Sequence, residues 1–213
     1  MSVNKIYAPA VSVAMQGLAY GALGDDAVAV AAATPLPMYS PGGFLTVSAS
    51  FARPADTTAY ASGDLVANNA VAGNVVPIEL VGAFRSAGEA VRIERVRLRK
   101  SSVGLTSASF RVHLFRLLPT VSAGDNAAFD NGSGLLSLAD INGYVGTVDV
   151  VMGYAAAIGA RGVGVLATGS GITCESAGVV GHETSLWALI EARGAYGPAS
   201  AETTTLTIEA ARS

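Results

Sequence analysis

The sequence is poor in charged residues. Only 14% of its 213 residues are Asp, Glu, Lys or Arg, whereas ordinary soluble domains carry roughly a quarter. Hydrophobic residues make up 51% of the chain. A chain with so few charges has much apolar surface to cover, so we expect contacts with other chains to cover part of it.

Cysteine and histidine are scarce. Cys174 is the one cysteine, so neither a disulfide nor a cluster of thiolate metal ligands can form within the chain. We expect Cys174 to behave as a small buried hydrophobic residue. His113 and His182 are far apart in sequence, and a zinc site of three or four ligands would need carboxylates to complete it. The sequence therefore predicts no metal site and no cofactor.

Motifs that indicate enzymatic chemistry are missing. The sequence has no Walker pattern, no Gly-x-Gly-x-x-Gly after a strand and no Gly-x-Ser-x-Gly elbow. A Ser-His-Asp arrangement stays an open alternative, because its members need not be close in sequence. Some of the carboxylates, such as Asp64, Glu89 and Asp125, lie beside Gly or Asn, where they serve turns, and the spacing of residues 125–132 does not match a calcium-binding EF-hand loop. We therefore predict that the chain is not an enzyme.

The net charge of −3 gives no overall attraction for nucleic acid or anionic lipid, so we expect direct contact with neither. Residues 11–23 are apolar, but polar and glycine residues interrupt them, and they fall short of the roughly 20 residues that a membrane-spanning helix needs. A secretory signal is an alternative interpretation, with Lys5 before this stretch and small residues at 31–33. Asp25 and Asp26 argue against it.

Two proline-containing clusters, at residues 35–37 and 41–43, divide the chain. Such clusters indicate a connector and not the interior of a helix or strand. We therefore expect residues 1–43 to form an N-terminal arm with a connector, and residues 44–213 to form the body. The apolar side chains of the arm that we expect to be buried against a neighbour are Val11, Val13, Met15, Leu18, Tyr20 and Leu23.

The body shows the two-residue periodicity of half-buried β-strands. In residues 44–52 Thr and Ser share one face, and the other face has Leu45, Val47, Ala49 and Phe51; residues 107–118 have the strongest pattern. Residues 153–160 are expected to form a short helix or a loop. The other expected strands lie within residues 75–84, 90–100, 145–151, 163–167, 186–193 and 203–210. The pattern predicts an all-β fold, an antiparallel jelly-roll-like β-sandwich with an extended N-terminal arm, and leaves a barrel as the alternative.

Residues 92–100 hold five of the thirteen basic residues. The apolar residues change parity between Ile93 and Val96, which predicts a bulge or bend around Glu94 and Arg95. A solvated edge strand guarded by positive charge would explain this run, and so would contact with an acidic protein surface. Nucleic acid binding is less compatible, because aromatic stacking partners are lacking nearby. The candidate contact residues are Arg92, Arg95, Arg97, Arg99 and Lys100.

Three blocks of the body resemble segments of small proteins encoded among the head genes of tailed bacteriophages. They are FLTVSASFARPADTTAYASGDLVAN (44–68), RVRLRKSSVGLTSASFRVHLF (95–115) with the following PTVSAGDNAAF, and LIEARGAYGPASAETTTLTIEA (189–210). The resemblance implies a capsid decoration, or cement, protein with a jelly-roll or related β-sandwich body. It implies binding to the major capsid protein at the outer surface of the virion, as a dimer or trimer of this chain. No motif carries contact residues over to this sequence.

Two other interpretations stay open. A receptor- or carbohydrate-binding β-sandwich of a phage fibre or tail would present exposed aromatic side chains. Tyr144, Tyr154 and Tyr196 lie near Gly-rich turns and are possible platforms for a sugar, whereas Trp187 lies within an expected strand. The chain could instead be another minor structural component of the virion, with a different location and copy number.

Overall fold

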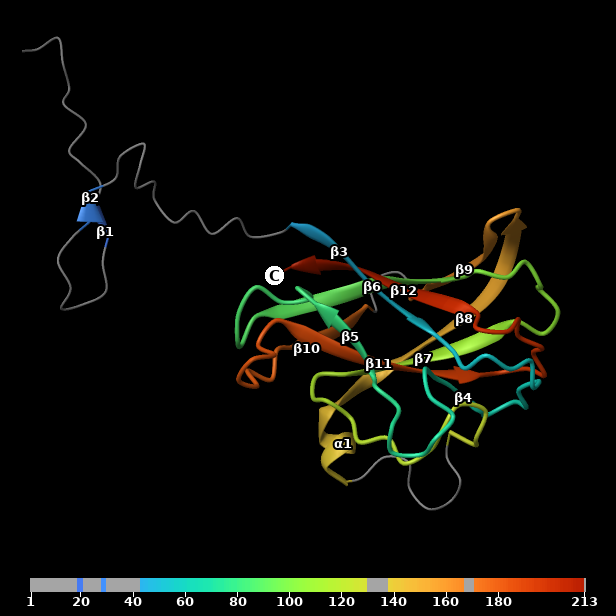
Figure 1. Ribbon diagram of the computed structural model, residues 1–213. Helices are drawn as coiled ribbons and strands as arrows, with labels where there is room; N and C mark the ends of the chain where they lie inside the picture. The colour runs from blue at the N-terminus through green and yellow to red at the C-terminus, as the bar shows by residue number, and fades with distance from the viewer. Residues whose placement is uncertain (1–18, 21–27, 30–42, 130–137, 167–170, 213) are drawn as a thin grey trace, which may run out of the picture. The chain divides into compact units, whose positions relative to one another are not determined.

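The computed structural model describes residues 19–20, 28–29, 43–129, 138–166 and 171–212. Residues 1–41 and 42–213 form two separate compact units, and each is described by itself. In the first unit, β1 (Ala19–Tyr20) pairs antiparallel with β2 (Val28–Ala29). The second unit is the body, and it contains nearly all of the described secondary structure (Figure 1).

The body is almost entirely β-structure, which confirms the expected all-β class. Its strands are β3 (Phe44–Ala52), β4 (Leu65–Val66), β5 (Ile78–Val81), β6 (Ala90–Lys100), β7 (Ser109–Phe115), β8 (Tyr144–Ala156), β9 (Gly159–Val165), β10 (Ile172–Glu175), β11 (Ser185–Ala192) and β12 (Thr203–Arg212). One short helix, α1 (Leu138–Gly143), precedes β8. Among the described residues, no helix has the length and apolar character needed to cross a membrane.

The expectation of a short helix or a loop over residues 153–160 was wrong. This segment contains the end of β8, a two-residue turn and the start of β9. Ala155 pairs with Ala160, and Ala156 pairs with Gly159. Alanine favours helices, but pairing between the two strands satisfies the backbone here, so tertiary context overrides the local propensity.

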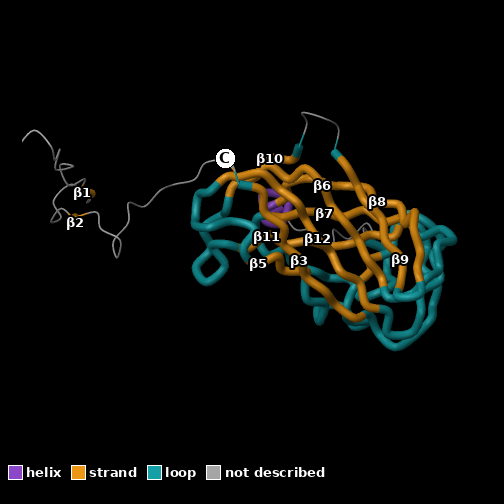
Figure 2. Tube along the Cα trace, turned by 90° about the horizontal axis from the view of Figure 1, so that it is seen from above, coloured by secondary structure: helices purple, strands orange, loops and turns teal. Residues whose placement is uncertain are grey.

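The strands form one continuous antiparallel sheet in the order β3-β12-β6-β9-β8-β7-β11-β4, while β10 pairs with β6 and β5 pairs with β11. The long strand β8 links the two halves of this order. Its first part pairs with β7, from Tyr144 to Val151, and its last part pairs with β9, from Met152 to Ala156. Because one strand serves two neighbours in succession, the sheet curls around a common interior (Figures 1 and 2).

Apolar side chains from both halves of the curled sheet meet in one hydrophobic core. Those from β6 and β12 include Ile93, Val96, Leu98, Leu206 and Ile208, and those from β7, β8 and β11 include Phe110, Val112, Leu114, Val150 and Ile190. A second cluster, with Phe129 and Trp187, covers the opposite side of β7 and β11. Every residue of β11 is consequently buried, so this strand has no solvent-facing row.

Strand β6 contains the expected bulge. Arg95 pairs with Glu209 of β12, but Ile93 pairs with the next residue, Ala210, which leaves Glu94 as the extra residue. The bulge changes the parity of the strand, and both Ile93 and Val96 are therefore buried. The four exposed arginines of β6 lie on the other side of the strand from this apolar set.

Candidate interaction face

Side chains that face away from the core on four neighbouring strands form one surface, which we call the outer face. Residues directly opposite each other in an antiparallel pair point to the same side of the sheet. The registers of β3, β12, β6 and β9 therefore align three rows of side chains. The first row is Ser50, Thr205, Arg99 and Arg161; the second is Ser48, Thr207, Arg97 and Val163; the third is Thr46, Glu209 and Arg95.

The part of the outer face over β3 and β12 is polar but mostly uncharged. The hydroxyl oxygens of Ser48 and Thr207 lie 2.7 Å apart, and those of Ser50 and Thr205 lie 2.8 Å apart. Both are cross-strand hydrogen bonds between side chains that face solvent. Such pairs stabilise a sheet modestly and leave a flat surface without long side chains.

Two of the four arginines in these rows share an acidic partner. Glu209 accepts a hydrogen bond from Arg95 at 3.0 Å and forms an ion pair with Arg97, with an oxygen-to-nitrogen distance of 2.5 Å. Beside the bulge, Arg92 lies 2.6 Å from Glu94. All of these groups are partly exposed, so each pair adds little stability, but the pairing neutralises local charge.

Arg99 and Arg161 differ from the other arginines. They lie directly opposite each other on β6 and β9, and both are exposed. Within the described part of the chain, no carboxylate pairs with either guanidinium. Like charges placed directly opposite each other destabilise a sheet. The two guanidinium groups therefore form a site of unneutralised positive charge.

Tyr154 of β8 completes this site. It lies opposite Arg161, and the Arg161 guanidinium carbon is 4.6 Å from the centre of its ring. This cation–π contact holds Arg161 beside Arg99. The residues surround a surface hollow of about 170 Å³ that also contacts Ile158, at the turn between β8 and β9.

Lys100 does not belong to the outer face. Lys100 is the last residue of β6 and points to the core side of the strand, and its side chain is 1% exposed. The ammonium group lies 3.3 Å from a carboxylate oxygen of Glu202 and 4.7 Å from the ring centre of Tyr196. Burial lowers the pKa of Lys100 below its usual value, and Glu202 offsets only part of this effect. Of the five basic candidates, Lys100 is therefore the one inside the molecule.

One of the six arm residues proposed for partner contacts lies among the described residues. Tyr20 lies in β1, where its backbone pairs with Val28. The others, Val11, Val13, Met15, Leu18 and Leu23, lie outside the described residues.

The two histidines occupy separate places. His113 lies on the side of β7 that packs against Phe129, with its Nε2 2.9 Å from a carboxylate oxygen of Glu191 and its Nδ1 3.3 Å from the Tyr144 hydroxyl. His182 lies 2.7 Å from Glu79 at a surface turn. Cys174 is buried as expected, and burial raises the pKa of its thiol to about 12. In the segments that the structure describes, His, Cys, Asp and Glu side chains do not gather in groups of three that could hold a metal ion.

The aromatic candidates for sugar stacking divide into two groups. Tyr196 is 2% exposed and Trp187 is 5% exposed, so neither can serve as a platform. Tyr144 and Tyr154 are 39% and 53% exposed. Of these two, Tyr154 lies beside the hollow.

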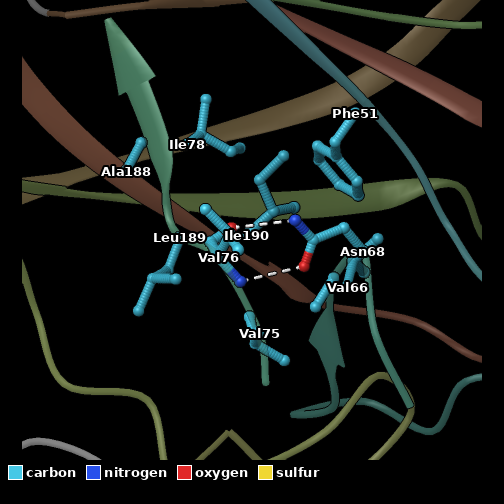
Figure 3. A pocket seen from close by; sticks show the side chains of 10 residues that line it. Phe51, Val66, Asn68, Val75, Val76, Ile78, Ala188, Leu189 and Ile190 are labelled. Atoms are coloured by element: carbon cyan, nitrogen blue, oxygen red, sulfur yellow. Dashed lines mark hydrogen bonds between the residues drawn. The ribbon is translucent and has the colours of Figure 1, made fainter. Parts of the chain in front are cut away.

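A second depression, shown in Figure 3, is too small to be a ligand site. It lies between β3, β4, β5 and β11, and its free volume is about 10 Å³. The side chain of Asn68 bridges it by bonding both the carbonyl and the amide of Val76, at 3.2 and 3.0 Å. Apolar side chains such as Phe51 and Ile78 line the rest. The space is about that of one water molecule.

Sequence reasoning identified four of the exposed arginines but missed Arg161. Residues 153–160 were expected to form a helix or loop, and that expectation concealed the pairing of Tyr154 with Arg161. The signal was present in Gly153 and Gly159, which bracket the segment and permit a sharp hairpin turn.

No protein-family model and no curated protein sequence matches this chain. The outer face is therefore the candidate functional site on geometric grounds.

Proposed function

We propose that this chain is a structural virion protein that binds the outside of a phage capsid shell and stabilises the shell by bridging capsomers. The blocks that resemble phage head proteins support this proposal. They include β3, the second half of β6 and most of β12. These strands are neighbours in the sheet and supply most of the outer face.

The observation that carries the proposal is the unneutralised positive charge at Arg99 and Arg161. The chain as a whole has a net charge of −3, so this site is a local exception and favours an acidic partner surface. Any molecule that binds the assembled shell and not its free subunits shifts the equilibrium toward the shell. A rigid body that contacts two capsomers at once would stabilise the particle in this way.

We also propose that the curled sheet is a β-sandwich of the jelly-roll-like kind. One layer would contain β3, β12, β6 and β9, and the other would contain β8, β7, β11 and the short strands beside it. The common core between the two halves and the passage of β8 from one half to the other support this interpretation.

The proposed partners are the major capsid protein and further copies of this chain, in a dimer or trimer. The proposal includes no cofactor, no enzymatic activity and no direct contact with nucleic acid or membrane. Sedimentation of the purified chain across a range of concentrations tests the oligomer. A chain that remains monomeric at high concentration would contradict that part of the proposal.

Quantitative mass spectrometry of purified virions tests the main proposal. We expect a copy number comparable with that of the major capsid protein, because a decoration protein covers the whole shell. A few copies per particle would instead indicate a minor component at a vertex, fibre or tail. Complete absence from the particle would exclude a virion role.

Binding of the purified protein to undecorated capsids provides a second test. Charge reversal at both Arg97 and Arg99 should weaken binding most strongly at low salt, because exposed charges are screened within about 10 Å at 0.1 M salt. Unchanged binding of this variant at low salt would favour a merely solvated role for the arginines.

Carbohydrate or receptor binding is the second candidate function, and exposed Tyr154 beside the hollow favours it. Aromatic rings are common stacking surfaces for sugars. Glycan-array binding by the isolated protein, without affinity for capsids, would support this candidate over capsid decoration.

A further inference from the structure

The hollow beside Arg99 and Arg161 has the chemistry of an anion site. A guanidinium group donates several N–H bonds in a fixed plane and pairs well with carboxylate or phosphate oxygens. Here two such groups occupy opposite positions on adjacent strands, and Tyr154 supports one of them. A bound anion would replace the repulsion between the two arginines with two favourable pairs.

The surroundings favour an isolated carboxylate over a polyanion. Glu209 lies on the same face, directly opposite Arg95. Its carboxylate forms ion pairs with Arg95 and Arg97 and so neutralises part of their charge. The face consequently has no continuous basic track for a nucleic acid backbone. Next to the arginines it presents neutral hydroxyl pairs, which a flat protein surface can approach closely.

The size of the hollow and its apolar border favour a protein ligand over a free small molecule. Its volume of about 170 Å³ is below the range of roughly 300–1,000 Å³ that is typical of small-molecule sites. Ile158 lines the hollow and is 74% exposed, and Val163, which is 47% exposed, lies on the same face two residues along β9 from Arg161. They offer apolar contact to the residues that flank an inserted acidic side chain.

We propose that this hollow binds the carboxylate of an Asp or Glu side chain on an acidic segment of a partner protein. Arg99 and Arg161 donate hydrogen bonds to the carboxylate oxygens, Tyr154 holds Arg161 in position, and Ile158 contacts the neighbouring apolar residues. The inference rests on the proposed function in one respect, because it takes the segment to belong to the protein that the outer face covers.

The test uses the full chain and a defined peptide. The acetylated, amidated peptide Gly-Glu-Glu-Gly is titrated into isotopically labelled protein, and the backbone amides of Tyr154, Gly159 and Ala160 are followed by NMR. We expect saturable shifts that decrease with added salt. The matched peptide Gly-Gln-Gln-Gly, which has the same shape without charge, should cause no saturable shift.

Substitutions in the hollow separate a specific site from general attraction. Arg99→Gln and Arg161→Gln should each weaken peptide binding about tenfold, because each removes charge-assisted hydrogen bonds. Arg116→Gln, which removes an exposed charge after β7, should bind like the unchanged protein. All three residues are exposed, so folding should be preserved, and circular dichroism checks this.

The inference is overturned if the glutamate peptide gives no saturable shift, or if the glutamine peptide binds equally. It is also overturned if the hollow variants bind unchanged, or if glucuronate binds in place of the peptide. The same variants are then tested on undecorated capsids. If both variants still decorate capsids, the proposed function stands and this inference is overturned. If the unchanged protein binds the peptide but does not decorate capsids, the hollow is an acidic-peptide site and the proposed function is overturned.

Discussion

At the residue scale, the body holds a buried polar cluster that pins an irregular segment to the sheet. Arg53, directly after β3, lies 2.9 Å from Asp125, and the side chains of both are 1% exposed. The Tyr60 hydroxyl donates to Asp125 at 2.7 Å. Burial raises the pKa of Tyr60, and its bond to Asp125 raises it further. Burial alone would lower the pKa of Arg53, but its bonds to Tyr60 and the charge of Asp125 raise it.

We predict that Asp125→Ala strongly destabilises the body. The substitution leaves the Arg53 guanidinium buried without its main counter-charge and should lower the free energy of unfolding by about 3–5 kcal/mol. Asp56→Ala is the matched control, because Asp56 also bonds Arg53 but its side chain is 41% exposed. The control should lose no more than about 1 kcal/mol. Urea denaturation measures both, and equal losses would contradict a special role for Asp125.

A second prediction concerns pH and His113. Burial lowers the pKa of His113 below its usual 6.5, despite the opposing effect of Glu191. The unfolded chain keeps the usual pKa, so below about pH 6.5 it binds more protons than the folded chain. The contribution of His113 to stability is therefore complete above that pH and declines as the pH falls.

Urea denaturation between about pH 7.5 and about pH 5 measures this decline. His113→Gln should make the free energy of unfolding less dependent on pH in this window. Burial raises the pKa of Glu191, but the hydrogen bonds from His113 and Arg193 outweigh it, so the pKa is lowered from its usual 4.5. Protonation of Glu191 therefore also reduces stability as the pH falls, but only below about pH 4.5. An unchanged slope in the variant would show that other groups cause the pH dependence.

At the element scale, β9 is built to lie close against β8. A Cβ atom added to Gly162 would lie 2.3 Å from the carbonyl oxygen of Val151, and one added to Gly164 would lie 2.6 Å from that of Asp149. Both glycines are buried. The absence of side chains here lets the sheet bend sharply where β8 passes from β7 to β9.

We therefore predict that Gly162→Ala destabilises the body by about 1–3 kcal/mol, because the added methyl group forces the two strands apart. Gly153→Ala is the matched control on β8, because no atom lies within 4 Å of its added Cβ. The control should change the free energy of unfolding by no more than about 0.5 kcal/mol. A comparable loss in the two variants would refute the close-packing explanation.

Elements with a clear period were predictable from sequence. Strands β3, β6 and β12 lie within about two residues of their expected ranges, because each has one apolar and one polar row. The bulge in β6 followed from the parity change between Ile93 and Val96. The two-residue strand β4 and the four-residue strand β10 carry too few residues to show a period, so they were missed.

At the scale of the whole molecule, the site depends on strands that are distant in sequence. The row that contains Ser50, Thr205, Arg99, Arg161 and Tyr154 crosses five strands. Sequence periodicity shows which residues of a strand share a face, but it does not show which strands are neighbours. Arg99 was thus predictable as exposed, whereas its position opposite Arg161 was not.

The last prediction concerns the N-terminal unit. Removal of residues 1–41 should leave the body folded, because residues 42–213 form a separate compact unit. The cut keeps Gly43, whose carbonyl accepts a hydrogen bond from the amide of Arg212. Under the proposed function, the shortened protein should bind capsids more weakly because the apolar arm contacts a neighbour.

Urea denaturation and capsid cosedimentation measure the two effects separately. Loss of stability on truncation would contradict the independence of the body. Full decoration by the shortened protein would defeat the proposed role of the arm.

The sequence by itself determined the all-β class, the parity of the main strands, the bulge in β6 and the burial of Cys174. These follow from local patterns, because a strand must bury its apolar row and a parity change needs an extra residue. Only the tertiary structure decided that Lys100 is buried with Glu202, that the main core and a second apolar cluster bury the two sides of β11, and that Arg99 faces Arg161. Those features depend on strand order and sheet curvature, which arise from contacts between residues far apart in the chain.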